Sequence, residues 1–545
     1  MQRFLCSALL VILVVVTGCS ADAGILTSAS GVPANAIKIT LAYSPEKEGW
    51  LTDRFAAFAA SKPKLNGRPI VVEGINKSSG AARTEMVQGT FKPTVWSPSS
   101  SAWLEVLKNE APNTPDPAVS NKALVLTPVV ISMWKPMAEA LGWPTKPIGW
   151  SDLLALTKSD KGWGEYNHPE WGRFTWGHTD PEISTTALST ILAEVYSANN
   201  KARGLTVADV QGPQTTQFLS DLSHSIRHYG YNTLVFSDNM KKYGMSYISA
   251  FPMEEITLID FNKGQPNPPL VAIYPREGTF FHDDPFIVMR NAPVEEQQAA
   301  AQLYDFLLTP ASQTVAMSYG FRPANPNVKL ASPLTPAFGI DPAQPQTTLE
   351  VPSGAVLVAA KQAWGQARKR ADIVLLLDIS GSMNGDKLDQ AKNGVGLFLS
   401  RLLPDDRVAL VTFSDKVTQV QPLAKLRDNR LQLDGAITDI QANGGTALYD
   451  GLQTALQTLK DVPDAQDRIQ AVVLLSDGAD NSSKTNLYQI KQQFVETNTT
   501  IFPIAYGSDA NETVLKAIAD FGRGEVIKGG TSDINKVFEN LSRYF

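Results

Sequence analysis

The sequence predicts an α/β protein of two domains, the second built on a doubly wound parallel sheet. Its 545 residues suggest three or four folding units, at roughly 100–200 residues per unit. Hydrophobic residues make up 43% and charged residues 19%, a balance that supplies globular cores and excludes a wholly disordered chain. Apolar strand-like runs alternate with helical stretches, which favours α/β architecture.

The chain opens with an export signal, expected over residues 1–18. Phe4 to Val16 is almost wholly apolar, which is short for a membrane span and typical of a signal peptide. Val16-Thr17-Gly18-Cys19 resembles the bacterial lipobox, which implies a lipid on Cys19 and an extracytoplasmic, membrane-anchored protein. An ordinary secretory signal cleaved nearby is the alternative. Residues 19–36 are small and polar, so we expect a flexible tether.

The first domain is expected over residues 37–345. Apolar runs predict strands, and amphipathic stretches between them predict helices. The expected strands are 37–44, 70–73, 124–134, 270–274 and 285–289, and the expected helices are 52–60, 103–108, 187–196, 294–308 and 310–318. Seven prolines between Pro323 and Pro352 mark the end of this domain.

This order of elements resembles the type 2 periplasmic solute-binding proteins of ABC uptake systems, in which two α/β lobes enclose a solute. Ser97-Pro98-Ser99 and Ser184-Thr185-Thr186 resemble the branch that binds sulfate or molybdate. Hydroxyls and backbone amides at helix N-termini suit an anion, whereas helix capping without a ligand is the alternative. The candidate solute ligands are Ser44, Ser97, Ser99 and Thr185.

Aromatic and histidine residues gather in the same domain. Nine of ten tryptophans lie between Trp50 and Trp176, and core packing is expected rather than stacking on a ligand. His224 and His228 are four apart on an expected helix, where a solvated face is favoured over a zinc site. His282-Asp283-Asp284 is expected to form a loop.

Residues 346–370 are expected to link the domains and to contain a helix from Gly354 to Arg370. The alternation that follows, over residues 371–545, predicts a parallel sheet with right-handed crossovers. The expected strands are 373–377, 407–413, 416–420, 469–475, 500–505 and 524–527, and the expected helices are 387–403, 427–440, 447–459, 486–496, 512–520 and 533–541.

Oxygen-bearing side chains follow these strands. Asp378, Ser380 and Ser382 follow the first strand, Asp477 follows another, and Thr446 opens a helix behind Gly444-Gly445. Ligands of such sheets bind at the carboxyl ends of the strands, so these side chains are expected to meet there. Oxygen ligands favour Mg²⁺, with Mn²⁺ or Ca²⁺ as alternatives, over Zn²⁺.

Asp-x-Ser-x-Ser at 378–382, Thr446 and Ser476-Asp477-Gly478 resemble the metal-ion-dependent adhesion site of von Willebrand factor A domains, whose fold is Rossmann-like. The resemblance implies that Ser380, Ser382 and Thr446 bind the metal directly, and that Asp378 and Asp477 bind it directly or through water. It also implies a protein partner that presents an acidic side chain to the metal. Asp450 is expected either to support this site or to be a solvated helix carboxylate.

The overall function expected is a lipid-anchored binding protein, with a metal-dependent partner site and a solute cleft. The alternative is the solute-capture component of an ABC importer with an accessory second domain. The net charge of −6 and the lack of a basic block argue against nucleic acid. An enzyme is not expected, since the sequence lacks HExxH, GxxxxGK[ST], GxSxG and a cysteine nucleophile.

Overall fold

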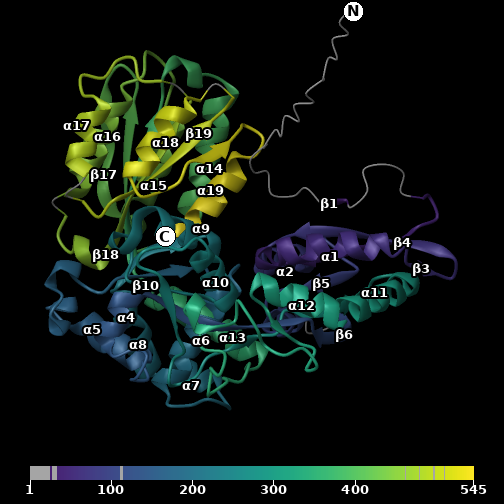
Figure 1. The fold of residues 1–545 in the computed structure, drawn as a ribbon. Coiled ribbons are helices and arrows are strands. Elements are labelled where there is room, and N and C mark those ends of the chain that lie inside the picture. Colours follow the sequence, from purple (N-terminus) through teal and green to yellow (C-terminus); the bar gives the residue numbers. More distant parts are fainter. Residues whose placement is uncertain are drawn as a thin grey trace, which may run out of the picture.

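The computed structural model describes residues 25–26, 33–110, 115–460, 462–477, 479–494, 497–508 and 510–545. Three sheets organise the chain: one in each lobe of the first domain and one in the C-terminal domain. Figure 1 shows the C-terminal domain stacked on the second lobe, with the first lobe beside it. The export signal and Cys19 lie outside the described residues. Within those residues, no helix has the length and apolar character needed to cross a membrane.

The first lobe is a sheet of order β1-β4-β2-β5-β13-β6, with β3 paired to β4. Its central strand β2 runs parallel to β4 and β5, as crossover connections require. The strands are β1 Ile25–Leu26, β2 Ile37–Tyr43, β3 Lys64–Leu65, β4 Arg68–Asn76, β5 Val95–Ser97, β6 Ala118–Ala123 and β13 Pro285–Met289. The helices are α1 Glu48–Ala60, α2 Ser79–Val87, α3 Ala102–Glu110, α11 Val294–Leu307 and α12 Pro310–Tyr319.

The second lobe is a sheet of order β11-β7-β10-β8-β9, with β12 and β14 also paired to β7. The strands are β7 Val125–Trp134, β8 Trp176–Thr179, β9 Ile226–Gly230, β10 Ala250–Glu254, β11 Leu270–Ile273, β12 Phe281–His282 and β14 Arg322–Pro323. The helices are α4 Lys135–Leu141, α5 Trp150–Lys158, α6 Thr185–Ala198, α7 Val207–Gln211, α8 Pro213–Ser223, α9 Thr233–Tyr243 and α10 Glu255–Lys263. The chain crosses between the lobes from β6 to β7 and returns from β12 to β13.

Most tryptophans of this domain are buried, which confirms their expected use in the core. Trp50, for example, packs against Phe321, and Trp150 packs edge-on against Trp176. The fully buried members include Trp50, Trp96, Trp103, Trp163 and Trp176. None of the ten lines the cavity between the lobes.

Helix α13 (Gly354–Ala367) joins the two domains and touches both lobes. It packs against α3 in the first lobe and against α6, α7 and α8 in the second. Glycine is needed at its first residue, since a Cβ on Gly354 would lie 2.5 Å from the Glu105 carbonyl oxygen. On its other side, Lys361 Nζ lies 2.9 Å from Glu182 Oε2. The helix expected in the linker therefore bridges the lobes.

The C-terminal domain is a sheet of order β17-β16-β15-β18-β19-β20. All neighbours are parallel except the edge strand β17, which is antiparallel to β16. The strands are β15 Arg370–Asp378, β16 Arg407–Phe413, β17 Val417–Lys425, β18 Arg468–Ser476, β19 Thr500–Tyr506 and β20 Ile527–Gly529. The helices are α14 Asp386–Arg401, α15 Leu426–Asp439, α16 Leu448–Lys460, α17 Leu487–Phe494, α18 Glu512–Phe521 and α19 Ile534–Leu541.

Side chains of the central strand β15 alternate between two hydrophobic cores, as the pleat requires. Val374 and Leu376 pack with α16, α17 and α18. Ile373 and Leu375 belong to the core that includes α14, α15 and α19. Because both faces are covered, the strand is an uninterrupted apolar run, which is why it could be recognised in the sequence.

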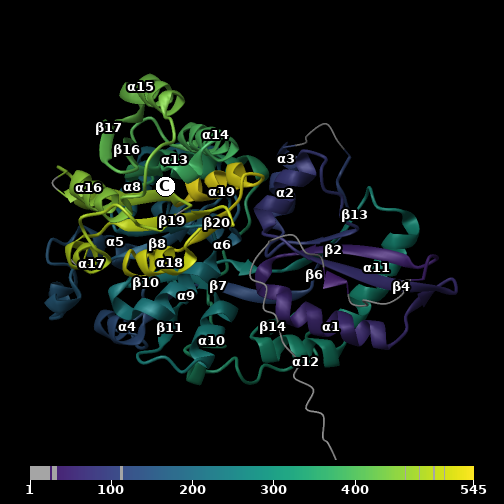
Figure 2. The same cartoon turned by 90° about the horizontal axis from the view of Figure 1, so that it is seen from above.

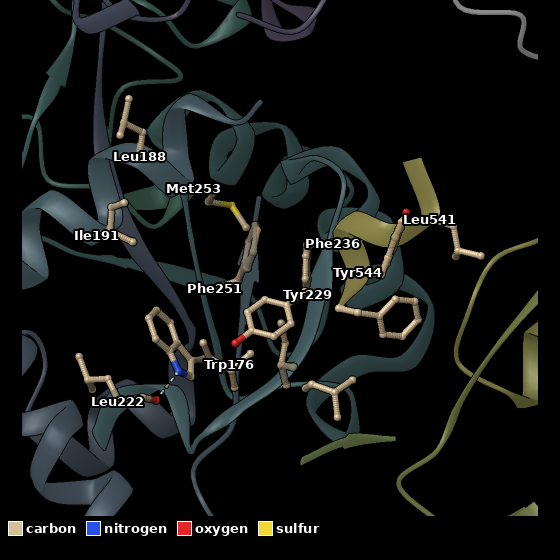
Figure 3. Packing of buried hydrophobic residues seen from close by; sticks show 14 of the residues in the cluster. Trp176, Leu188, Ile191, Leu222, Tyr229, Phe236, Phe251, Met253, Leu541 and Tyr544 are labelled. Atoms are coloured by element: carbon tan, nitrogen blue, oxygen red, sulfur yellow. Dashed lines mark hydrogen bonds between the residues drawn. The ribbon is translucent and has the colours of Figure 1, made fainter. Parts of the chain in front are cut away.

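The C-terminal domain packs on the second lobe through its last residues. Figure 3 shows Leu541 and Tyr544 beside Tyr229 and Phe236 of that lobe, and all four belong to one hydrophobic core. At the edge of this contact, Arg543 Nη1 donates to Asp180 Oδ2 at 2.7 Å. Seen from above in Figure 2, the C-terminal domain leaves the first lobe uncovered.

Three sequence expectations about local structure were wrong. His228 lies in strand β9 rather than on a helix, because the segment after α8 is buried and pairs in parallel with β8. His282 lies in the short strand β12, which pairs with β7. The last strand is Ile527–Gly529 instead of 524–527; at Gly524 the backbone passes so close to the Ile501 carbonyl that a Cβ would lie 1.9 Å from it.

Candidate functional site

Two groups of polar side chains are candidates, and the first lies at the carboxyl edge of the C-terminal sheet. Asp378 ends β15 and Ser476 ends the neighbouring strand β18. The Asp378 carboxylate accepts the Ser380 backbone N–H at Oδ1 (2.9 Å) and the Ser476 hydroxyl at Oδ2 (2.7 Å). These bonds fix a fully buried carboxylate at the centre of the edge.

Hydroxyl groups connect Asp378's loop to Asp477. Ser380 Oγ lies 3.0 Å from Ser382 Oγ, and Ser382 Oγ donates to Asp477 Oδ1 at 2.7 Å. Ser382 is exposed, whereas Asp477 is buried. Four of the five residues expected at the metal site therefore lie in one hydrogen-bonded cluster that reaches the surface. Gly478 of the same motif lies outside the described residues.

Thr446, the fifth, sits in an adjacent loop. The Gly381 N–H donates to the Gly444 carbonyl at 3.0 Å, which joins this loop to the Ser380 loop. Gly444 adopts φ 75°, and a Cβ there would meet the Asp415 carboxylate. The Thr446 N–H donates to Asn481 Oδ1 at 2.8 Å. Among the described residues, its hydroxyl makes no hydrogen bond to the other four.

A lysine that the sequence reasoning missed completes this edge. Lys387, in the first turn of α14, places Nζ 2.5 Å from Asp477 Oδ2. Burial raises the pKa of the Asp378 carboxyl, hydrogen bonds from Ser380 and Ser476 lower it in part, and the Asp477 charge raises it further. Negative charge is thus concentrated here, and a side-chain ammonium is drawn to it. The one feature of the sequence that indicates a lysine at this site is the position of Lys387, nine residues after Asp378.

This donor set fits a hard divalent cation. It offers two carboxylates and three hydroxyls, the oxygen ligands that Mg²⁺, Mn²⁺ and Ca²⁺ prefer. In the part of the chain that the structure describes, no three His, Cys, Asp or Glu side chains come together as ligands, so hydroxyls would have to contribute. Asp450 is turned to another use, since its carboxylate accepts the N–H groups of Lys484 (3.0 Å) and Thr485 (2.8 Å).

The second candidate is a cavity of about 50 Å³ between the two lobes of the first domain. Hydrogen bonds bridge the lobes at its rim: Thr185 Oγ1 donates to Ser79 Oγ at 3.1 Å, and the Gly80 N–H donates to the Ile183 carbonyl at 3.2 Å. Pockets for drug-sized ligands usually measure roughly 300–1,000 Å³. The lobes are therefore closed on a space for water or one small group.

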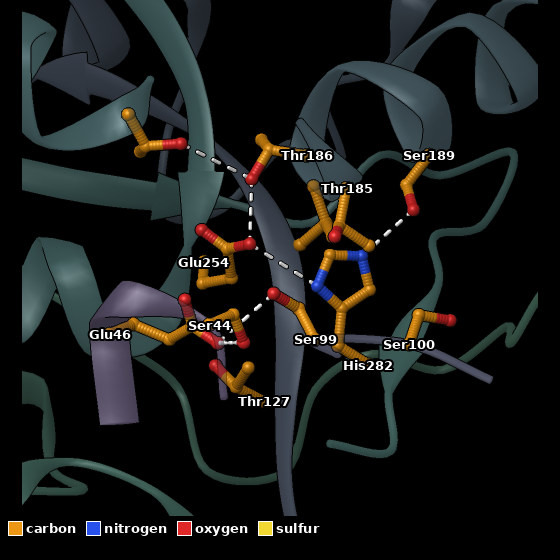
Figure 4. A network of polar contacts seen from close by, with 12 residues as sticks. Ser44, Glu46, Ser99, Ser100, Thr127, Thr185, Thr186, Ser189, Glu254 and His282 are labelled. Atoms are coloured by element: carbon orange, nitrogen blue, oxygen red, sulfur yellow. Dashed lines mark hydrogen bonds and ion pairs between the residues drawn. The ribbon is translucent and has the colours of Figure 1, made fainter. Parts of the chain in front are cut away.

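Three of the four hydroxyl residues expected to bind solute, Ser44, Ser99 and Thr185, line this cavity. The fourth, Ser97, is fully buried and is not among the lining residues, because it belongs to the covered strand β5. Ser44 Oγ and Ser99 Oγ both donate to Glu46 Oε1, the latter at 3.0 Å. Figure 4 shows these hydroxyls turned toward Glu46. They are thus engaged by a carboxylate.

Serine and threonine hydroxyls make up most of the cavity wall, and its charged side chains are both acidic. Glu46 and Glu254 line it, and none of its lining residues is Lys, Arg or His. Glu254 Oε1 accepts the Thr186 hydroxyl at 2.6 Å and lies 3.3 Å from His282 Nδ1. Burial raises the pKa of Glu46, but the Lys47 charge and hydrogen bonds outweigh it, so the pKa falls below its ordinary value.

Lys47 lies behind Glu46 and is fully buried. Its Nζ lies within 3.2 Å of four oxygen atoms, of which Asp284 Oδ1 is the nearest at 2.5 Å. This ammonium is already surrounded by acceptors. The sequence singled out neither Lys47 nor the two glutamates, since Glu46 and Glu254 are distant in the chain and no motif joins them.

Ser189, His282 and Glu254 are linked like a nucleophile, base and acid. Ser189 Oγ lies 2.8 Å from His282 Nε2, whose other ring nitrogen faces Glu254. All three are buried, and the cavity beside Ser189 measures about 10 Å³. In this arrangement of the lobes, the space beside Ser189 is too small for a substrate.

Comparisons with known proteins match the two domains to two different families. The family model described as bacterial extracellular solute-binding protein matches residues 53–345, and the model of the von Willebrand factor type A domain matches residues 372–538. An uncharacterized protein of Synechocystis sp. is 30% identical over 175 residues, which cover 31% of this chain and 40% of that protein. Inter-alpha-trypsin inhibitor heavy chain H4 of Bos taurus is 27% identical over 157 residues, which cover 27% of this chain and 17% of that protein.

Among solved structures, a periplasmic thiamin binding protein is 14% identical with a TM-score of 0.44, and covers 62% of this chain and 98% of its own. A von Willebrand factor type A protein from Catenulispora acidiphila is 24% identical with a TM-score of 0.30, and the match covers 32% of this chain and 42% of that one. The chain spans less than half the length of these two curated relatives. The solute-binding model spans more than half of the chain, and the protein belongs to the bacterial extracellular solute-binding proteins, with a von Willebrand factor type A domain after that region.

Proposed function

We propose that this protein is a lipid-anchored, extracytoplasmic binding protein with a metal-dependent partner site. The type A domain holds a divalent cation at its sheet edge and, through it, an acidic side chain of a protein partner. The first domain takes a small solute between its lobes. The observation that carries the proposal is the cluster of Asp378, Ser380, Ser382 and Asp477, joined by hydrogen bonds at one edge.

Each residue of the cluster has a separate part in this function. Asp378 and Asp477 supply negative charge, and the Ser380, Ser382 and Thr446 hydroxyls supply neutral oxygens. A bound Mg²⁺ would supply an open coordination position for a partner carboxylate. Lys387 Nζ now neutralises part of the Asp477 charge and would have to leave when a metal binds. The exposure of Ser382 leaves the edge accessible to a partner.

The test is a pull-down from a cell-envelope extract with native protein, Asp378→Ala and Asp428→Ala. Asp428 is an exposed carboxylate on α15 of the same domain and serves as the matched control. We expect partner proteins to bind to the native and control chains with Mg²⁺, to be released by EDTA, and to be absent from Asp378→Ala. Partner binding retained by Asp378→Ala contradicts the proposal.

The lipid anchor is a separate part of the proposal and rests on the lipobox-like sequence at Cys19. The family's extracellular character supports export. We expect the native chain to be recovered with the membrane fraction and Cys19→Ala to be recovered outside it. Equal membrane recovery of both would exclude lipidation of Cys19 as the anchor.

The cavity between two lobes favours a second candidate, the solute-capture component of an ABC uptake system. In that role the protein binds its solute equally well with Mg²⁺ and with EDTA, and its type A domain is accessory. Solute binding without any metal-dependent partner would favour this candidate. In both, we propose recognition without turnover, a role supported by the enclosure of Ser189.

A further inference from the structure

We propose that the cleft of the first domain binds a solute through a positively charged ammonium group, held between Glu46 and Glu254. This rests on the proposed solute-binding role of the cleft, and it names the chemical class of the solute. It also replaces the anion that the hydroxyl-rich turns of the sequence suggested.

The charge of the cavity wall supports a cation. Glu46 comes from the first lobe and Glu254 from the second, and no basic side chain is among the lining residues. Figure 4 shows both carboxylates among polar side chains, Glu46 in contact with Ser44 and Ser99, and Glu254 in contact with Thr186 and His282. An anion in this space would face carboxylates, whereas an ammonium group would be attracted to both lobes at once and would favour their closure.

The nearby basic groups are already engaged. Lys47 Nζ is fully buried and contacts Ser44 Oγ (2.6 Å), the Pro98 carbonyl (3.2 Å), Glu46 and Asp284. His282 lies between Glu254 and Ser189. Neither lines the cavity. An anion would therefore find no positive side chain at the cavity wall.

The hydroxyl groups also favour a cation. Ser44 and Ser99 direct their O–H groups at Glu46, and Thr186 directs its O–H group at Glu254. The Ser44 and Thr186 oxygens already accept from Lys47 (2.6 Å) and Thr233 (3.4 Å), whereas Ser99 Oγ keeps acceptor capacity for an N–H donor of a primary ammonium group. Ser78 also lines the cavity, and its buried hydroxyl has no partner in the described part of the chain. The Tyr231 ring at the wall adds a surface suited to a cation.

An ammonium group fits better than a metal ion. The described residues contain no cluster of three His, Cys, Asp or Glu ligands, and the two glutamates alone leave a metal short of charged ligands. The cavity of about 50 Å³ exceeds the roughly 30 Å³ that one water occupies in the liquid. It therefore accepts a compact head group, and the rest of a larger amine would require the lobes to part.

The experiment is calorimetric titration of the full chain in EDTA, which removes divalent metal from the type A domain. The probes are ethylammonium, ethanolamine and putrescine as amines, sulfate and molybdate as anions, and glycerol as a neutral solute. A separate titration without EDTA uses Ca²⁺ and Mn²⁺. The variants are Glu254→Gln and Glu46→Gln, with Glu139→Gln, an exposed acid on α4 of the second lobe, as the control.

We expect at least one amine to bind, and both cleft variants to weaken it tenfold or more while Glu139→Gln leaves it unchanged. If Glu46→Gln fails to fold because Lys47 loses a partner, Glu254→Gln decides the test. Binding of an anion or glycerol with no amine bound overturns the ammonium proposal but leaves the solute role standing. Binding of metal alone in the cleft, or amine binding insensitive to Glu254→Gln, also overturns it. If no solute of any class binds, the solute role fails as well.

Discussion

The two candidate sites hold their carboxylates in opposite ways. In the cleft, Lys47 is fully buried between Glu46 and Asp284, and a serine hydroxyl and a carbonyl complete its surroundings. At the type A edge, Lys387 is 23% exposed and contacts Asp477 from the rim. The buried lysine is part of the framework. The exposed one lies where it can give way to another cation.

This difference separates a permanent charge from an exchangeable one. A buried ion pair costs desolvation free energy, and removing one partner leaves an uncompensated charge in the interior. In the pair at the type A edge only Lys387 is partly exposed, so an incoming cation can take its place while buried Asp477 keeps a positive partner. The cleft is therefore expected to be rigid in its charge pattern, while the type A edge is expected to respond to metal.

The largest effect is expected from Lys47→Met, which leaves Glu46 and Asp284 without their ammonium partner. Loss of one partner of a buried pair costs about 3–5 kcal/mol in the free energy of unfolding. Urea unfolding followed by circular dichroism measures it, with exposed Lys92→Met as the control, expected within about 0.5 kcal/mol of native. Mg²⁺ should restore none of the loss. A stability equal to that of the control would show that the cleft does not need this charge.

A smaller effect is expected from Lys387→Met, and it should be reversible. Without metal, buried Asp477 loses a hydrogen-bonded cation, which costs about 1–3 kcal/mol. With metal, the variant no longer has a competing ammonium, so Mg²⁺ affinity should rise about tenfold, equivalent to roughly 1.4 kcal/mol.

Thermal unfolding in EDTA and in Mg²⁺ measures both changes, because a ligand that binds only the folded state stabilises it. Lys416→Met, an exposed lysine of the same domain, is the control. Weaker Mg²⁺ binding by Lys387→Met would mean that the lysine supports the site rather than competing for it.

The same contrast explains what the sequence could predict. Asp378, Ser380 and Ser382 follow one strand within five residues, so their convergence is a local consequence of strand and turn, and Asp477 follows the adjacent strand. Parallel α/β units place such positions at a common edge. The fold of this domain was equally readable, because β15 is buried on both faces and its apolar run is unbroken.

The acidic character of the cleft could not be predicted from local sequence patterns. Glu46 and Glu254 come from different lobes, and they line one cavity because the lobes are held together by contacts such as that of Thr185 with Ser79. Ser44, Ser99 and Thr185, which the sequence suggested as solute ligands, line this cavity, and Ser97 does not. The sequence suggested these hydroxyls as donors to an anion, whereas Ser44 and Ser99 donate to Glu46, since a hydroxyl donates or accepts according to its neighbours. The charge of the neighbours is a tertiary property.

The smallest effect is expected where the two domains meet, from Arg543→Gln. Arg543 Nη1 donates to Asp180 Oδ2 at 2.7 Å, and Asp180 Oδ1 accepts the Glu182 N–H at 2.8 Å. The segment that Asp180 holds continues into Ile183 and Thr185 at the cavity wall. Removing the charge should lower the free energy of unfolding by about 1 kcal/mol or less, because the pair is partly exposed.

Its informative readout is local rather than global. Hydrogen exchange should become faster in residues 180–186, and solute affinity should fall by up to about fivefold if the same 1 kcal/mol is lost on cleft closure. Arg401→Gln, which loses an exposed contact with Glu539, should leave both unchanged. Unchanged exchange in residues 180–186 would mean that the second lobe orders this segment alone. Faster exchange would mean that the type A domain helps to position residues 180–186 at the cleft. The metal site and the solute cleft would then be physically connected.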